Sequence, residues 1–151
     1  MTTARRLQSG GLIDRSRRIR FKFNGKDYSG HPGDSLAAAL LAQGVRCFGR
    51  SFKYHRPRGV VGAGAEEPNA LVQVGEGALS TPNLRATQVE LYEGLIARTV
   101  NGWPSLAFDV GAINNRLSRL LPAGFYYKTF MWPRSAWMRY EHYIRRAAGL
   151  G

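Results

Sequence analysis

The sequence predicts an α+β fold of the β-grasp type, in which one helix packs on a small mixed sheet. Three observations predict it: a hairpin pattern over residues 19–29, a short apolar helix over 36–43, and two strands at 71–74 and 86–91 that follow a long loop. This order is typical of a single sheet covered by one helix. The 151 residues suffice for one domain of ordinary size.

The hairpin is the clearest local signal. Apolar and basic residues alternate over 19–23, the period of two that a strand with one buried face shows. Asn24 and Gly25 follow, and this pair favours a type I′ turn because both central residues need positive φ. Residues 26–29 are therefore expected to form the return strand.

The helix has recognisable start and stop signals. Asp34 or Ser35 can cap its first turn through a side-chain oxygen. Residues 36–43 are mostly Ala and Leu, which are strong helix formers, and Gly44 follows where a left-handed stop belongs. A helix this apolar is expected to be buried against the sheet.

Two flanking segments differ in character from the domain, which we place at residues 19–95. Residues 1–18 are predicted to form an extended basic arm that orders against another surface. Residues 96–151 are predicted to form an irregular, partly helical docking extension, with a helix over 135–148. The extension is rich in aromatic residues and arginine, which are enriched at protein interfaces.

The charge balance limits the possible partners. The chain has 22 Lys and Arg against 10 Asp and Glu, a net charge of +12 that favours nucleic acid, an anionic cofactor or an acidic protein. The longest apolar run, 36–42, is far shorter than the roughly 20 residues that span a bilayer. We therefore expect no membrane association, and the lone Cys47 fits a reducing, cytoplasmic location.

The densest cluster of candidate binding residues lies between residues 50 and 58. Interleaved cations and aromatic rings can bind single-stranded nucleic acid, a cofactor phosphate or an acidic partner. We take as contact residues Arg50, Lys53, Tyr54, His55, Arg56 and Arg58. No catalytic set can be assembled, and the three histidines lack the spacing of metal ligands.

Six strings in the chain resemble one family. They are GGLIDR at 10–15, HPGDSLA at 31–37, GRSFKYHRPRG at 49–59, EEPNALV at 66–72, AGFYYKTFMWP at 123–133 and IRRAAGLG at 144–151. Together they resemble the N-terminal region of the α subunit of heterotetrameric sarcosine oxidase.

This resemblance implies a non-catalytic module of a flavoenzyme complex that oxidatively demethylates sarcosine to glycine. The implied FAD, FMN, NAD and tetrahydrofolate are held by other domains or subunits, so no cofactor is expected on this chain alone. The implied partners are the rest of the α subunit and the other subunits. Further docking residues are then Tyr126, Tyr127, Lys128 and Trp132.

The domain also resembles the plant-type [2Fe–2S] ferredoxin domains of related amine and amino-acid dehydrogenases. Their ligand pattern falls here on Gly62, Glu67, Ala70 and Thr87. None of these residues is cysteine, so the resemblance implies a ferredoxin-like scaffold without a cluster. Two alternatives stay open: a [2Fe–2S] electron-transfer domain and a basic nucleic-acid-binding module.

Overall fold

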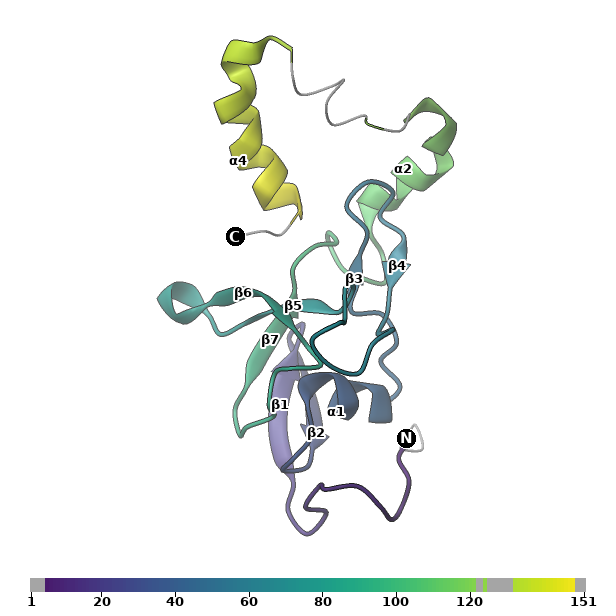
Figure 1. Ribbon diagram of the computed structural model, residues 1–151, viewed down its shortest axis with the longest axis vertical. Helices are drawn as coiled ribbons and strands as arrows, with labels where there is room; N and C mark the ends of the chain where they lie inside the picture. The colour runs from purple at the N-terminus through teal and green to yellow at the C-terminus, as the bar shows by residue number, and fades with distance from the viewer. Residues whose placement is uncertain (1–4, 122–123, 125–131, 149–151) are drawn as a thin grey trace.

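A five-stranded mixed sheet forms the centre of the protein, seen in a computed structural model that describes residues 5–121, 124 and 132–148 (Figure 1). The spatial order is β2-β1-β7-β5-β6, with β1 and β7 parallel and the other neighbours antiparallel. The strands are β1 (Ile19–Phe23), β2 (Lys26–Gly30), β5 (Leu71–Val74), β6 (Thr81–Arg85) and β7 (Ile96–Thr99). The α+β fold of the β-grasp type is thereby confirmed.

The predicted hairpin forms in the expected register. Phe23 pairs with Lys26, and the turn residues Asn24 and Gly25 have φ of 51° and 75°. The apolar residues of β1 are buried while the basic residues between them are exposed. The two-residue period therefore fixed both the register and the buried face.

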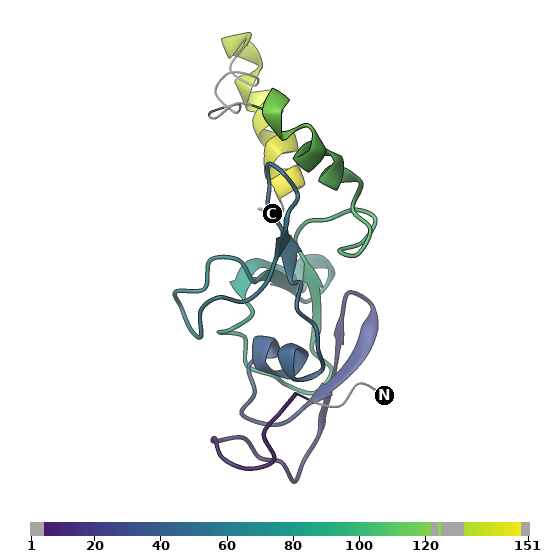
Figure 2. The ribbon, with the colours of Figure 1, turned by 90° about the vertical axis from the view of Figure 1, so that its right-hand side faces the viewer.

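The predicted helix is α1 (Leu36–Ala42), and it lies beside the β1–β2 hairpin (Figures 1 and 2). Of the two possible caps, Ser35 is used: its hydroxyl accepts a hydrogen bond from the Ala38 amide at 3.2 Å. The helix packs so closely that a Cβ on Gly30 would lie 2.9 Å from the Ala39 Cβ of α1, and it would also collide with a methyl group of Leu91. Only glycine fits at this end of β2.

The strand predicted at 86–91 is wrong. The edge strand is instead β6, and residues 86–91 turn across the start of α1. The carbonyls of Ala86 and Val89 accept hydrogen bonds from the amides of Ala37 and Leu36, at 2.9 and 2.8 Å. These amides have no partner within the helix, so the segment completes the helix end in place of a ladder. A strand and a segment packed across the start of a helix can show the same alternation of apolar and polar residues, so the sequence pattern does not separate them.

The sheet also extends past residue 95, the predicted end of the domain. The strand β7 lies between β1 and β5 and pairs with both. The apolar core collects residues from the hairpin, α1 and β7, including Phe21, Leu40 and Ala97. The sheet domain therefore includes residues up to Thr99, and the name extension is kept for the residues that follow.

The described part of the basic arm contacts the chain's own domain. The Arg5 amide donates to the Ala42 carbonyl at 2.7 Å, at the end of α1. Arg6 donates two hydrogen bonds to the Asp34 carboxylate, at 2.8 and 2.7 Å. The Asp34 side chain is buried, so this two-pronged ion pair fixes the arm beside the helix.

The extension lies beyond the small ribbon of β3 (Gly49–Arg50) and β4 (Pro57–Arg58), at the end of the molecule opposite the arm (Figures 1 and 2). The predicted C-terminal helix is present as α4 (Trp137–Ala148). Short helical turns make up the remainder: η1 (Gly77–Leu79) in the domain, and η2 (Val110–Ala112), α2 (Ile113–Arg116), η3 (Ser118–Leu120) and η4 (Arg134–Ala136) in the extension. Within 5–121 and 132–148, none of the helices combines the length and apolar character needed to cross a bilayer.

Candidate functional site

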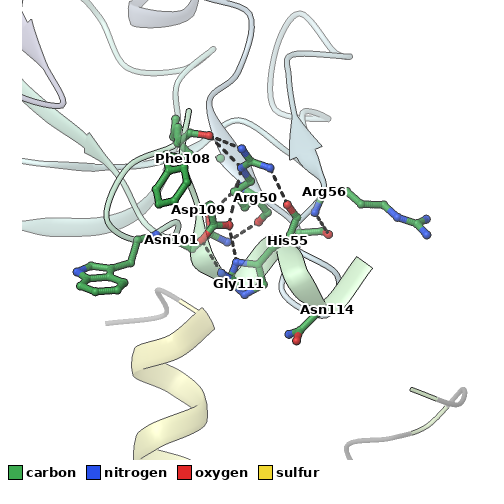
Figure 3. Close-up of polar contacts among 12 residues, drawn as sticks. Arg50, His55, Arg56, Asn101, Phe108, Asp109, Gly111 and Asn114 are labelled. Carbon is green, nitrogen blue, oxygen red and sulfur yellow. Dashed lines mark hydrogen bonds and ion pairs between the residues drawn. The ribbon is translucent and has the colours of Figure 1, made fainter. Parts of the chain in front are cut away.

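The basic loop at 50–58 turns toward the chain's own extension. Its ends pair as β3 and β4, and the Ser51 amide donates to the Arg56 carbonyl at 2.9 Å, which closes the loop. The loop residues then contact the segment from Asn101 to Leu121 (Figure 3). Much of the predicted docking set is therefore used within this chain.

A buried carboxylate, Asp109, lies at the centre of this contact. Its Oδ1 accepts hydrogen bonds from the amides of Trp103 and Gly111, at 3.2 and 3.1 Å, and its Oδ2 lies 2.7 Å from His55 Nδ1. Although burial opposes the charged form, these hydrogen bonds hold the pKa of Asp109 below its ordinary value. An ionised carboxylate can only accept, so His55 Nδ1 carries the proton and donates it.

Arg50 joins the loop to the extension at several points. Its guanidinium donates to the Leu106 carbonyl at 3.1 Å and to the His55 carbonyl at 2.9 Å, and it lies 3.8 Å from Asp109. The backbone of Arg50 also exchanges two hydrogen bonds with the Asn101 side chain. Arg50 thus links the loop to the extension within the chain, and backbone carbonyls accept hydrogen bonds from its planar guanidinium group.

The outer edge of the loop is built around Tyr54. Lys53 Nζ and the Arg56 guanidinium carbon each lie 4.7 Å from the centre of its ring. The Tyr54 hydroxyl donates to the Leu121 carbonyl at 3.3 Å, and Arg56 Nε donates to the Asn115 side chain at 2.7 Å. Cations above an aromatic face are attracted by its negative charge density.

The predicted docking residues therefore divide into groups. Arg50 and His55 are largely buried in the contact with the extension, while Arg56, Arg58 and Trp132 keep exposed side chains. Tyr126, Tyr127 and Lys128 lie outside the described residues. Sequence reasoning missed Asp109 as the centre of the contact, although it is one of only three acidic residues after residue 91.

The second centre is the loop that contains Glu67, whose side chain is fully buried. Its Oε2 accepts from the amides of Val61 and Gly62, at 2.7 and 2.6 Å. Its Oε1 accepts from the amides of Asn69 and Ala70, at 2.7 and 3.1 Å. Four backbone N–H groups thus converge on one carboxylate, and they keep the pKa of Glu67 below its ordinary value despite burial.

Of the four positions that the ferredoxin resemblance assigned, Glu67 supplies this carboxylate and the other three contact it or its loop. The amides of Gly62 and Ala70 bind Glu67 directly, and the Thr87 hydroxyl donates to the Gly64 carbonyl at 2.8 Å. Glu67 is the only one of the four with an ionisable side chain. The loop is thereby closed by a carboxylate.

The sheet and this loop lie within one stretch of the chain that matches a known domain family. Residues 16–102 match the family described as the 2Fe-2S iron-sulfur cluster binding domain, and the chain belongs to that family.

Within this family, the similar curated proteins share one name, and they confirm the resemblance to the sarcosine oxidase α subunit that the sequence showed. The chain is 62% identical to the sarcosine oxidase subunit alpha of Rhizobium meliloti (strain 1021), over 97% of this chain and 15% of that protein. It is 38% identical to the subunit of the same name from Corynebacterium sp. (strain U-96), over 62% of this chain and 10% of that one. Among solved structures, an L-proline dehydrogenase from P. horikoshii matches with a TM-score of 0.47 and 22% identity, over 61% of this chain and 17% of that one.

The residues present do not fit the cluster for which the family is named. Cysteine thiolates hold such a cluster, and this chain has a single cysteine, Cys47, whose Sγ lies 3.4 Å from the Gly49 carbonyl. In the part of the chain that the structure describes, no three His, Cys, Asp or Glu side chains gather as metal ligands. We therefore assign no electron-transfer step to this domain.

Proposed function

We propose that this chain is the N-terminal structural and docking module of a sarcosine oxidase α subunit, within a flavoenzyme complex that demethylates sarcosine to glycine. The match over 97% of the chain to a subunit of that name supports this proposal. The chain spans only 10–15% of the length of these relatives, so most of such a subunit lies in other domains. FAD, FMN, NAD and tetrahydrofolate would be bound there or on the other subunits, in the cytoplasm.

The observation that carries the docking role is the apolar surface of the extension. In residues 100–121 and 132–146, only Asp109 is buried. Large apolar side chains there are more than half exposed: Trp103, Phe108, Val110, Ile113, Leu120, Trp132, Met138 and Tyr143. So many exposed apolar side chains in a short segment are typical of a protein-binding surface.

Charge indicates what kind of surface would cover the extension. Arg98, Arg145 and Arg146 line one groove together with Trp103 and His142. A basic groove beside exposed aromatic rings complements an acidic protein surface with apolar pockets. We propose that a neighbouring domain or subunit supplies this surface.

The test uses the complete oxidase with single substitutions in this module. Leu120→Asp and Trp132→Asp place a charge on the proposed surface, where the side chains are 75% and 81% exposed. We expect each to weaken subunit association about 30-fold, the effect of losing a hot spot of about 2 kcal/mol. The matched control is Leu79→Asp, which charges an 87% exposed leucine in η1, outside the extension.

Retention of the other subunits and of flavin absorbance on size-exclusion chromatography gives the readout. The proposal is supported if the two extension variants lose subunits while the Leu79→Asp control retains them. The melting temperature of the module should stay the same in all three variants. Equal retention in all three variants would contradict it. Binding to RNA that falls steeply with salt would instead favour the nucleic-acid alternative.

A further inference from the structure

We propose that the loop 61–70 is an anion-binding site that the chain fills with its own Glu67 carboxylate. Removing this side chain then leaves a site for a small free carboxylate. The inference depends on the loop alone and holds whether or not the extension docks on a partner.

The first argument is the arrangement of donors. Each oxygen of Glu67 accepts two backbone hydrogen bonds, and all four lie between 2.6 and 3.1 Å. Hydrogen bonds from neutral donors to an ionised acceptor are about twice as strong as those between neutral groups. Successive backbone amides that point into one concavity form a known type of anion site.

The second argument is burial. The Glu67 side chain is fully excluded from solvent, whereas Glu and Asp are almost never fully buried unless they are paired. Without an anion, the amides of Val61, Gly62, Asn69 and Ala70 would lose these hydrogen bonds, and the side of each N–H that faces the buried Glu67 carboxylate would have no acceptor. Such orphaned buried donors are rare because each costs the desolvation of its N–H group.

The third argument is that other contacts hold the loop in place. Arg85 Nε donates to the Glu67 carbonyl at 3.1 Å, and the Ala86 amide donates to the Ala70 carbonyl at 2.9 Å. The Thr87 hydroxyl binds the Gly64 carbonyl at 2.8 Å. These three contacts involve no carboxylate oxygen, so the amides stay directed inward when the Glu67 side chain is shortened.

The neighbouring Glu66 shows what a less enclosed carboxylate does. It accepts hydrogen bonds from the amides of Ala63 and Gly64, at 2.6 and 2.9 Å, but it is exposed. Water can replace an exposed acceptor at little cost. Glu66→Ala is therefore the matched control for Glu67→Ala: adjacent, equally charged, and bonded to amides of the same loop.

The experiment is chemical rescue in the full 151-residue chain. Glu67→Ala removes the atoms of an acetate ion, so sodium acetate is the probe, with sodium chloride at equal ionic strength and acetamide as comparisons. We expect Glu67→Ala to lower the melting temperature by roughly 5 °C or more. Acetate should then raise it progressively, because a ligand that binds only the folded state stabilises that state.

Four amide resonances give the direct readout. In Glu67→Ala, acetate should shift the ¹⁵N–¹H signals of Val61, Gly62, Asn69 and Ala70 with one saturating curve. Wild type and Glu66→Ala should respond alike to acetate and chloride. Glu67→Gln should be destabilised without rescue, because its amide fills the site and turns a donor toward two N–H groups.

The remaining outcomes either reject or support the proposal. It is rejected if acetate and chloride act equally on Glu67→Ala, or if that variant keeps the wild-type melting temperature. Should the variant not fold in chloride, recovery of the folded state in acetate supports the site, and failure in both salts rejects it. Rescue by acetamide as strong as by acetate would show that the site recognises shape without charge.

Discussion

The sheet domain and the extension of this protein are stabilised by different kinds of interaction. Every buried apolar residue that the structure describes lies between Ile19 and Ala97. The described part of the extension has a single buried residue, Asp109, which joins it to the 50–58 loop through a hydrogen bond from His55 and an ion pair with Arg50. The domain therefore has its own core, whereas the extension depends on polar contacts.

This difference in stabilisation corresponds to different roles for the core of the domain and the surface of the extension. A core of this kind is stabilised by the apolar area that it removes from water. The extension leaves large apolar side chains exposed and is held to the loop by Asp109 and by further hydrogen bonds from Arg50, Tyr54 and Arg56. Its surface is thus available to a partner, while its backbone near the domain is already fixed.

The largest expected effect tests the core. Leu40→Ala removes a fully buried side chain on α1 and should lower the free energy of unfolding by about 3 kcal/mol. Urea denaturation followed by circular dichroism measures it. Leu41→Ala, one residue along and 38% exposed, is the control, with an expected loss below about 1 kcal/mol. Equal losses would mean that the helix does not bury the face described here.

The next effect tests the polar attachment of the extension. Asp109→Ala should destabilise the contact by about 2 kcal/mol, because it leaves buried donors unpaired. Hydrogen exchange should speed up at Trp103 and Gly111 while the sheet amides stay protected. Faster exchange throughout the sheet would show that the two regions unfold together.

Acid should have the same local effect as this substitution. Because the folded pKa of Asp109 lies below its ordinary value of 3.8, its ionised form stabilises the contact above that pH. This stabilisation is lost as the pH falls from 3.8 through the lowered pKa. The amide signals of Gly111 in NMR spectra should follow the loss, and Asp109→Asn should abolish the dependence at this site.

A smaller effect tests the packing of the loop against the extension. A Cβ on Gly111 would lie 2.3 Å from the His55 ring, so Gly111→Ala should cost about 1–3 kcal/mol. His55→Ala should relieve this clash. A double-mutant cycle by thermal melting measures the coupling. Strictly additive effects would show that the two residues do not touch in solution.

The smallest effect concerns Tyr54. Tyr54→Phe removes only the hydrogen bond to the Leu121 carbonyl and should cost about 0.5–1 kcal/mol. Tyr54→Leu also removes the ring beneath Lys53 and Arg56, adding about 0.5–1 kcal/mol. Urea unfolding of both variants separates the contributions. No difference between them would mean that the cations gain nothing from the ring.

Local patterns predicted the fold better than they predicted the site. The hairpin, α1 and α4 could be foreseen because each depends on neighbours in the sequence: an Asn-Gly turn, an apolar helix, a helix after Pro133. The segment 86–91 could not, because its partners are amides of α1, some 50 residues away. Burial alternated there for a reason unrelated to a strand.

The two buried carboxylates show the same limit. The sequence by itself determined the α+β order, the +12 charge, the single cysteine and the family resemblance, since these need only composition and short-range pattern. Only the tertiary structure decided that Asp109 joins the extension to the basic loop and that Glu67 closes its own loop. A carboxylate's role depends on which backbone amides surround it, and folding alone brings those amides together.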